Sequence, residues 1–293
     1  MERIPYVISE DIEVLLKEWA KMRNFKIPSE NYFKKLREEF KRKLEEIFGK
    51  GNVDMVSSQE LRGEMQKLIY QTGLPAVSMD RVYIRTSPSI EVSRIVDDFL
   101  NDCGIGSRFG APPLQEQLFK VKERFKEIVL VDDVIFSGKV ISEILLSLNK
   151  LGVKVPIVVA GITIGEGAEI LKEKTGAEIL TVRYYKEVID EICERDFYPG
   201  VPLSGRLMTT SSIEIGVPYL LPFGKPCEWA SIPKERVKEF SQFCLEQTIK
   251  LWETIEKVSR KIVRCKDLER LPRGLSNDSS RFVDELWRVK HFL

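Results

Sequence analysis

The chain has 293 residues, which is enough for one large domain or for one medium-sized domain with attachments. Hydrophobic residues make up 43% of the sequence, so the chain can bury a sizeable core. The formal net charge of +1 argues against a broad nucleic-acid-binding surface. The single histidine, His291, argues against a histidine-based catalytic triad and against a histidine metal site.

The cysteines and the hydropathy pattern indicate the compartment. The five cysteines are widely spaced and form no C-x-x-C motif, which is typical of reduced thiols in a cytoplasmic protein. The first residues lack the apolar run of a signal peptide, and no apolar segment has the length of a membrane span. We therefore expect a cytoplasmic protein that has no membrane partner.

The first segment with a clear pattern is 10–48, which predicts two helices. Apolar residues recur there at three- and four-residue steps, as on the buried face of a helix. Pro28 separates the two helices, and Ser29 is a suitable N-cap for the second. The many Lys and Glu residues of the second helix indicate a solvated face. We predict a helical N-terminal extension over residues 1–51.

From residue 52 onward the pattern becomes mixed α/β. We expect helices over 57–70, 88–100, 114–125, 138–151 and 166–175, strands over 75–84, 128–132, 155–163 and 178–185, and a loop over 103–113. Regular alternation of strands and helices predicts right-handed crossovers and a parallel sheet. The predicted fold class is therefore α/β, with a parallel-sheet domain over 52–226.

The last third begins with a turn-rich segment, 196–226, and then becomes helical. A long amphipathic helix is expected after Pro233, with an apolar stripe that runs from Val237 to Ile262. A last helix carries Phe282, Leu286 and Trp287. We predict a helical C-terminal extension over 227–293 that packs against 10–48, either as a cap or as the interface of a homodimer.

The most informative segment is 127–140, EIVLVDDVIFSGKV. A buried strand is followed by two adjacent carboxylates, Asp132 and Asp133, and then by a tight Ser137-Gly138 turn before a helix. Ligands of open α/β sheets lie outside the carboxyl ends of strands, and helix N-termini bind phosphate. The pattern indicates a sugar-phosphate site, in which carboxylates accept hydrogen bonds from ribose hydroxyls. The alternative is a buried strand and an Asp-Asp turn that bind nothing.

This segment resembles the phosphoribosyl pyrophosphate (PRPP) motif of type I phosphoribosyltransferases. The resemblance implies that Asp132 and Asp133 are the catalytic acids that hold the ribose 2′ and 3′ hydroxyls. It implies that Ser137, Gly138 and Lys139 bind the 5′-phosphate. It also implies Mg²⁺, which the two acids would contact indirectly, through ribose hydroxyls or water. The chain departs from the motif at Val140, where the family prefers Thr, and at Phe136, which is atypical.

Two other segments carry candidate binding residues. Arg81 and Arg85 suit pyrophosphate, because a guanidinium binds two oxygens at once, although a surface ion pair with Asp80 is an alternative. Residues 196–200, DFYPG, resemble the hood that covers the base in hypoxanthine-guanine phosphoribosyltransferases. This resemblance implies that Phe197 or Tyr198 stacks on a base and that Arg206 approaches pyrophosphate. The alternative is a structural turn with a core Phe.

Two glycine-rich segments remain. Residues 104–110 are expected to form either a lid that closes over the site or a plain connector. Residues 161–167 lack the G-x-G-x-x-G spacing of dinucleotide-binding loops, and we interpret them as a strand-to-helix turn.

Two functions follow from the resemblance. The first is an enzyme that transfers phosphoribose from PRPP to a nitrogenous base or a related acceptor and releases pyrophosphate. The second is a regulatory protein of the same fold that binds PRPP or a nucleotide monophosphate without turnover. The sequence does not identify the acceptor.

Overall fold

The computed structural model describes residues 3–209 and 212–293, which form two compact units. The core unit comprises Val56–Arg94 and Gly104–Val188, and the flank unit comprises the chain up to Met55 together with Ile95–Cys103 and Ile189–Leu293. The predicted boundaries at 51 and 226 therefore differ from those of the structure. Residues 189–226 belong with both helical extensions and not with the parallel sheet.

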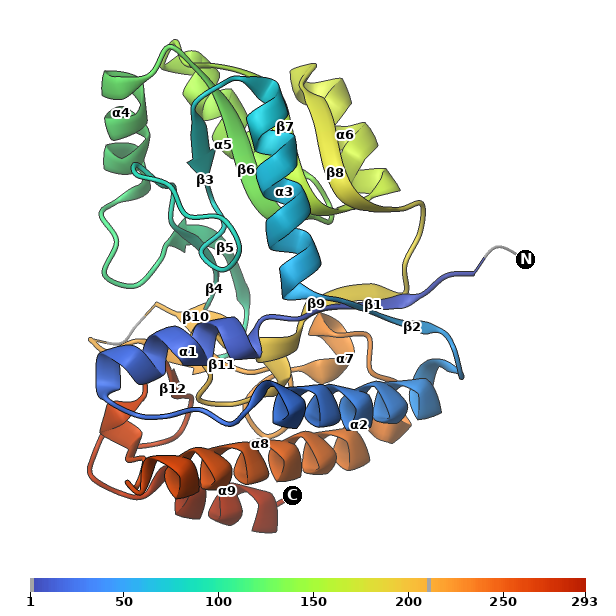
Figure 1. Ribbon diagram of the computed structural model, residues 1–293, viewed down its shortest axis with the longest axis vertical. Helices are drawn as coiled ribbons and strands as arrows, with labels where there is room; N and C mark the ends of the chain where they lie inside the picture. Colours follow the sequence, from blue (N-terminus) through green and yellow to red (C-terminus); the bar gives the residue numbers. More distant parts are fainter. Residues whose placement is uncertain (1–2, 210–211) are drawn as a thin grey trace. The chain divides into compact units, whose positions relative to one another are not determined.

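The core unit is built on a four-stranded sheet in the order β3-β6-β7-β8 (Figure 1). The strands are β3 (Ala76–Ser78), β6 (Glu127–Ile135), β7 (Lys154–Ile164) and β8 (Glu178–Tyr185). Every neighbouring pair is parallel, which confirms the α/β fold class with a parallel sheet. The apolar runs of β6 and β7 are nearly continuous, as expected for strands with both faces covered.

Helices cover both faces of this sheet. They are α3 (Ser58–Thr72), α4 (Leu114–Arg124), α5 (Lys139–Lys150) and α6 (Gly165–Thr175). Gly161 of β7 faces α3, because a Cβ there would lie 3.2 Å from Leu61 and 3.3 Å from Met65. Its neighbour Ala160 points to the opposite face and belongs to a buried cluster with Ile144 of α5 and Leu171 of α6.

The local signals of these elements agree with the structure. Ser57 caps α3 by accepting a hydrogen bond from the Glu60 N–H, and left-handed glycines end α3 at Gly73 and α6 at Gly176. The helices predicted over 57–70, 114–125, 138–151 and 166–175 are confirmed, as are the strands over 155–163 and 178–185. The strand predicted over 75–84 ends early, at Ser78.

The helix predicted over 88–100 and the loop predicted over 103–113 are wrong. The chain instead forms two strands, β4 (Val92–Val96) and β5 (Asp102–Ser107), which are neighbours in one sheet. The Asp97 N–H donates to the Asn101 carbonyl at 3.2 Å, and the Arg108 N–H donates to the Glu91 carbonyl at 3.0 Å. This pattern is that of an antiparallel hairpin.

The residue types explain why the hairpin forms. The segment is rich in β-branched residues, which favour strands when they find a partner. Ile95 and Val96 find one in β10, where they align with Leu207 and Met208. The Asp97 carboxylate accepts hydrogen bonds from the N–H groups of Phe99 and Asn101 and so closes the turn. The partner lies more than a hundred residues away, beyond the reach of local patterns.

The flank unit combines helices with two small sheets. Its helices are α1 (Ile12–Arg23), α2 (Glu30–Phe48), α7 (Pro226–Trp229), α8 (Val237–Ser259) and α9 (Phe282–His291). One sheet has the order β2-β1-β9, formed by Val53–Val56, Tyr6–Ser9 and Asp190–Cys193. The other has the order β12-β11-β10-β4-β5, where β10 is Arg206–Met208, β11 is Ile215–Val217 and β12 is Leu271–Pro272. Of its strands β4 and β5, the residues up to Arg94 and from Gly104 onward belong to the core unit. The helices predicted over 10–48 and after Pro233 are confirmed.

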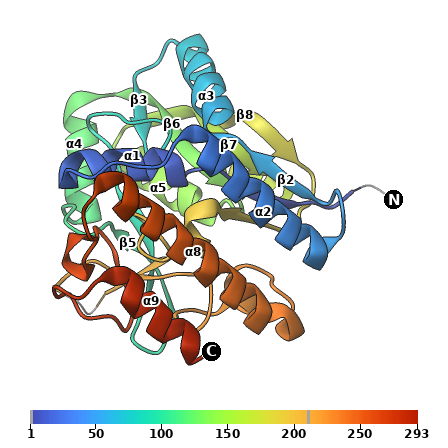
Figure 2. The same cartoon turned by 60° about the horizontal axis from the view of Figure 1, so that its bottom comes forward.

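An aromatic cluster explains why residues 189–226 join the helices. Phe197 lies 5.5 Å from Phe40 of α2 and 5.2 Å from Phe240 of α8, measured between ring centroids. Trp19 of α1 contacts Trp252 of α8 edge to face at 5.1 Å. Figure 2 shows α2 and α8 side by side. The apolar stripe of α8 therefore packs inside the chain against 10–48, as predicted, whereas a homodimer stays a prediction.

Within residues 3–209 and 212–293, no helix has both the length and the apolar character that crossing a membrane requires.

Candidate functional site

The carboxylate pair lies inside strand β6 and not after it. The strand continues to Ile135, which aligns with Thr163 of β7, whereas the sequence pattern predicted its end at residue 132. Asp132 aligns with Ala160, and the Asp132 Oδ1 accepts a hydrogen bond from the Asp133 N–H at 3.0 Å. Both acids are half-buried near the carboxyl end of the sheet. This is the end at which open α/β sheets bind ligands.

The predicted phosphate loop directly precedes α5. Gly138 is the N-cap residue of this helix and has a left-handed backbone, with φ +66°. Its carbonyl accepts hydrogen bonds from the Ser142 N–H at 3.0 Å and from the Ser142 hydroxyl at 2.6 Å. Lys139 is the first residue of the helix and is exposed. The free N–H groups, the helix dipole and the ammonium group together favour an anion here.

The loop packs directly against the first turn of α6. A Cβ on Gly138 would lie 2.5 Å from the Gly167 carbonyl oxygen, and a Cβ on Gly167 would lie 2.2 Å from the Phe136 carbonyl oxygen. The interpretation of 161–167 as a strand-to-helix turn is confirmed, since Gly165 begins α6. Gly138 and Gly167 allow the predicted phosphate loop and the first turn of α6 to touch backbone to backbone.

The loop after β3 lies beside the acid pair. The Met79 N–H donates to the Val131 carbonyl at 2.8 Å, one residue before Asp132. The Asp80 carboxylate holds the loop by accepting hydrogen bonds from the N–H groups of Val82, Tyr83 and Ile84, at 2.6, 2.7 and 2.6 Å. This loop carries Arg81 and Arg85. The structure therefore brings the arginine loop next to β6.

The segment 104–110 also reaches this loop. Its first part is strand β5, and Arg108, which follows the strand, donates to the Met79 carbonyl at 3.3 Å. The Arg108 Nε lies 4.0 Å from the Glu91 Oε2. The expected alternatives were a lid and a plain connector. The structure shows one arm of a hairpin, with an arginine against the loop that follows β3.

Burial and mutual repulsion raise the pKa values of Asp132 and Asp80. Burial, followed by the charges of Asp133 and Asp80, raises the pKa of Asp132 well above its usual range. Burial and the Asp133 charge raise the pKa of Asp80 to about 6, against the opposing effect of its three N–H donors. Burial and repulsion therefore oppose the ionisation of these carboxyl groups, and hydroxyl donors or a cation would relieve the repulsion.

Asp80→Asn tests this electrostatic picture. The folded-state pKa of Asp80 lies above that of the unfolded chain, so its ionisation favours unfolding as the pH rises from about 4 to about 6. We expect the variant to gain stability relative to the parent between pH 4 and pH 8, by on the order of 2 kcal/mol. Chemical denaturation of both proteins at pH 4 and at pH 8 measures this change. The effect of the lost hydrogen bonds does not depend on pH, so it cancels when the two pH values are compared.

A carboxylate whose pKa is shifted downward serves as the control. Hydrogen bonds from Asn101, first from its side chain and then from its backbone, lower the pKa of Asp97. Asp97→Asn is therefore expected to change the pH dependence with the opposite sign and at lower pH, because the stability that a lowered pKa provides is lost as the pH falls below about 4. An Asp80→Asn variant whose stability relative to the parent is the same at both pH values would contradict the assigned repulsion.

The prediction that Phe197 or Tyr198 stacks on a base is wrong. Phe197 and Tyr198 are completely buried in the flank unit, where their rings pack against Phe40. Neither ring has a face available to a base, so the alternative interpretation, a structural turn with core aromatics, holds. Their apolar character, which suggested stacking, serves the core instead.

Arg206 also has another role. Its Nη1 forms an ion pair with Asp102 at 2.7 Å, and its guanidinium lies 4.5 Å from the Trp229 ring centroid. The side chain is nearly buried. These contacts hold β10 within the flank unit. We therefore no longer propose that Arg206 binds pyrophosphate.

Two residues at this end of the sheet were not predicted as part of the site. Asp80 follows β3 in the same way as Asp132 follows the apolar run of β6. This similarity could have predicted Asp80 as a site residue. Thr163, the last residue but one of β7, aligns with Ile135, and its buried hydroxyl has no hydrogen-bond partner among the described residues. An isolated Thr at the end of an apolar strand gives no signal of its own.

The described part of the chain contains no group of three or more His, Cys, Asp or Glu residues arranged to hold a metal ion. The donors that remain are the paired carboxylates of Asp132 and Asp133. Mg²⁺ commonly uses one or two carboxylates and takes its other ligands from water and substrate phosphates. The donor set fits such a shared ion and does not fit an all-protein cage.

No family model and no curated protein matches the chain. Among solved structures, it is similar to orotate phosphoribosyltransferase from Aeropyrum pernix, with 17% identity, over 32% of this chain and 59% of that one, at a TM-score of 0.20. It is also similar to UMP synthase of Leishmania donovani, with 13% identity, over 43% and 27% of the two chains, at a TM-score of 0.26. The chain spans less than two thirds of either protein. Similarity at this level carries no argument, so the function rests on the residues of the site.

Proposed function

We propose that the core unit binds PRPP with Mg²⁺ and transfers its phosphoribosyl group to a nitrogenous base or a related acceptor. One observation carries the proposal: the acid pair of β6 leads, within one strand-loop-helix unit, into a left-handed glycine at the N-terminus of α5. Carboxylates and an anion site joined in this order suit a molecule that has hydroxyls at one end and a phosphate at the other.

Each part of the site has a task in this reaction. Asp132 and Asp133 accept hydrogen bonds from the ribose hydroxyls and orient the sugar. Their negative charge stabilises the oxocarbenium-like transition state, in which the bond from C1′ to pyrophosphate breaks before the bond to nitrogen is complete. The N–H groups at the start of α5 and the Lys139 ammonium bind the 5′-phosphate. Arg81 and Arg85 bind the departing pyrophosphate.

The Mg²⁺ ion would be held by Asp132 or Asp133 through water or ribose hydroxyls, together with oxygens of the substrate. When bound, it neutralises charge on the pyrophosphate. The acceptor nitrogen loses its proton to solvent or to a group of the acceptor, and pyrophosphate leaves with the bonding electron pair. The residues of the site do not select among bases, amines and larger acceptors.

A regulatory protein on the same fold is the second candidate. Val140 follows Lys139 on α5 and packs against the hydrophobic core, so it supplies no hydroxyl for a phosphate. Phe136 supplies no acid or base beside the sugar. With Phe197 and Tyr198 buried, no aromatic of that segment serves a base. Such a site would bind PRPP or a nucleotide monophosphate and respond without turnover.

Thermal unfolding in Mg²⁺ with PRPP separates the candidates when it is combined with a pyrophosphate-release assay. The comparison ligands are pyrophosphate, ribose 5-phosphate and nucleoside monophosphates. A ligand at about 100 times its Kd stabilises the folded state by about 2.7 kcal/mol. Stabilisation together with pyrophosphate release in the presence of a base supports the transferase. Stabilisation without release supports the sensor, and no response to any of these ligands refutes both.

Replacing Asp132 and Asp133 together by Asn tests the site itself. We expect the PRPP-induced stabilisation to fall by at least about 2 kcal/mol, because neutral amides accept weaker hydrogen bonds and lend no charge. The matched control is Glu143→Gln with Glu173→Gln, which removes two charges from exposed positions of the same unit. Full PRPP-induced stabilisation of the Asp132 and Asp133 variant would place the ligand elsewhere.

A further inference from the structure

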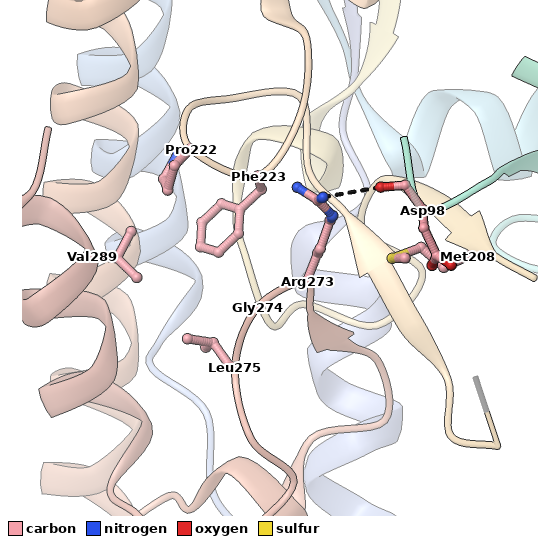
Figure 3. A pocket seen from close by; sticks show the side chains of 8 residues that line it. All are labelled: Asp98, Met208, Pro222, Phe223, Arg273, Gly274, Leu275 and Val289. Atoms are coloured by element: carbon pink, nitrogen blue, oxygen red, sulfur yellow. Dashed lines mark hydrogen bonds between the residues drawn. The ribbon is translucent and has the colours of Figure 1, made fainter. Parts of the chain in front are cut away.

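The flank unit contains a cavity of about 500 Å³ that the proposed function does not use. Figure 3 shows it between the loop that precedes α7, the segment after β12 and helix α9. Its apolar wall is formed by Met208, Pro222, Phe223, Leu275 and Val289. A cavity of this size accommodates a small organic ligand.

One cation faces this apolar wall. Arg273 is half-buried, its N–H donates to the Gly216 carbonyl at 2.9 Å, and its Nη2 donates to the backbone carbonyl of Asp98 at 3.1 Å. Figure 3 shows the guanidinium between Asp98 and Phe223. Among the described residues, the side chain thus donates one hydrogen bond, to a backbone carbonyl, out of the five N–H donors of a guanidinium.

The other buried arginines of this unit differ from Arg273. Arg206 pairs with Asp102 at 2.7 Å, and Arg270 pairs with Glu214 at 2.7 Å. Within the described ranges, Arg273 forms no ion pair with any carboxylate. A partly desolvated guanidinium without an anion is the feature that a carboxylate ligand would complete.

The charge balance limits the kind of anion. Asp98 lines the same cavity, so its wall carries one positive and one negative side chain. A multivalent anion such as pyrophosphate would bring several negative charges to a wall that carries a single arginine. A single carboxylate on an apolar body satisfies both the guanidinium and the hydrophobic wall.

We propose that this cavity binds a small apolar carboxylate, with the carboxylate on Arg273 and the apolar part against Phe223 and Leu275. The ligand has the chemistry of a free apolar amino acid or of the corresponding simple carboxylic acid. None of the residues that line the cavity belongs to the candidate PRPP site. The binding is therefore a separate property of the chain.

Titration calorimetry of the full chain tests the proposal with leucine, 4-methylpentanoate, 3-methylbutylamine and inorganic phosphate. We expect 4-methylpentanoate or leucine to bind and the amine and phosphate not to bind. Binding of leucine alone identifies an amino acid whose ammonium group contributes to recognition. Binding of both identifies the carboxylate as sufficient. Absence of both, or equal binding of the amine, overturns the proposal.

Arg273→Gln is the variant that locates the ligand. It is expected to lower the affinity for the carboxylate at least about tenfold, because the charge-assisted hydrogen bonds are lost. Arg288→Gln, on the exposed side of α9, is the control and leaves the affinity unchanged. Circular dichroism checks that both variants are folded. Should Arg273→Gln fail to fold, Leu275→Ser weakens the apolar contact instead, and unchanged affinity in the variant that folds refutes this site.

Discussion

Replacing Arg37 by Met is expected to destabilise the flank unit by about 3–5 kcal/mol. The Arg37 Nε lies 3.1 and 3.2 Å from the two carboxylate oxygens of Glu194, whose side chain has no exposed surface. The same carboxylate accepts hydrogen bonds from the N–H groups of Asp11 and Ile12, where α1 begins. Without the guanidinium, Glu194 stays buried as an uncompensated charge.

Chemical denaturation measures this loss in the free energy of unfolding. Two further variants show whether it comes from the buried charge. Arg42→Met removes another arginine from α2 that is more exposed, and we expect a change within about 0.5 kcal/mol. Glu194→Gln combined with Arg37→Met should recover part of the stability, because the unpaired Glu194 charge is removed as well. If the double variant were no more stable than Arg37→Met, lost packing and not charge would explain the effect.

Gly167→Ala is expected to disable the phosphate loop without changing any residue of the loop. The new Cβ would lie 2.2 Å from the carbonyl oxygen and 2.8 Å from the carbonyl carbon of Phe136, which are backbone atoms. The loop that ends at Gly138 must therefore move. We expect a loss of about 1–3 kcal/mol in stability, as for other overpacked sites, together with loss of the PRPP-induced thermal shift.

Gly63→Ala is the matched control, since Gly63 also lies within a helix of the core unit. A Cβ on Gly63 would meet nothing within 4 Å, so Ala should stabilise α3 by about 0.5–1 kcal/mol. Thermal unfolding with and without PRPP measures the stability and the PRPP-induced shift of both variants. A Gly167→Ala protein with the full ligand-induced shift would show that the loop does not hold the phosphate.

The candidate site illustrates how far local patterns reach. Asp132, Asp133, Ser137, Gly138 and Lys139 lie within eight positions, so strand, turn and helix signals were enough to group them. Asp80, in the loop after β3, and Gly167, in the first turn of α6, join the site only because β3 and β7 flank β6 in the sheet. The order of the strands in the sheet determines these neighbours, and local sequence patterns do not predict that order.

Aromatic residues show the opposite limit. Phe197 and Tyr198 have the composition of a stacking site, and only their packing against α2 and α8 shows that they are core residues. The hairpin formed by β4 and β5 is a similar case, because the periodicity of 88–100 also suits a helix. Pairing with β10 decides its conformation, since a strand needs a partner that may lie anywhere in the chain.

The sequence by itself determined the parallel α/β core, most of the helix ends and the motif of β6 and α5. These features depend on the apolar period, on caps and on glycine, all of which act within a few residues. The tertiary structure alone decided the division into two units, the hairpin and the burial of Glu194 against Arg37. These depend on contacts between distant segments, where the free energy of burial and pairing outweighs local preference.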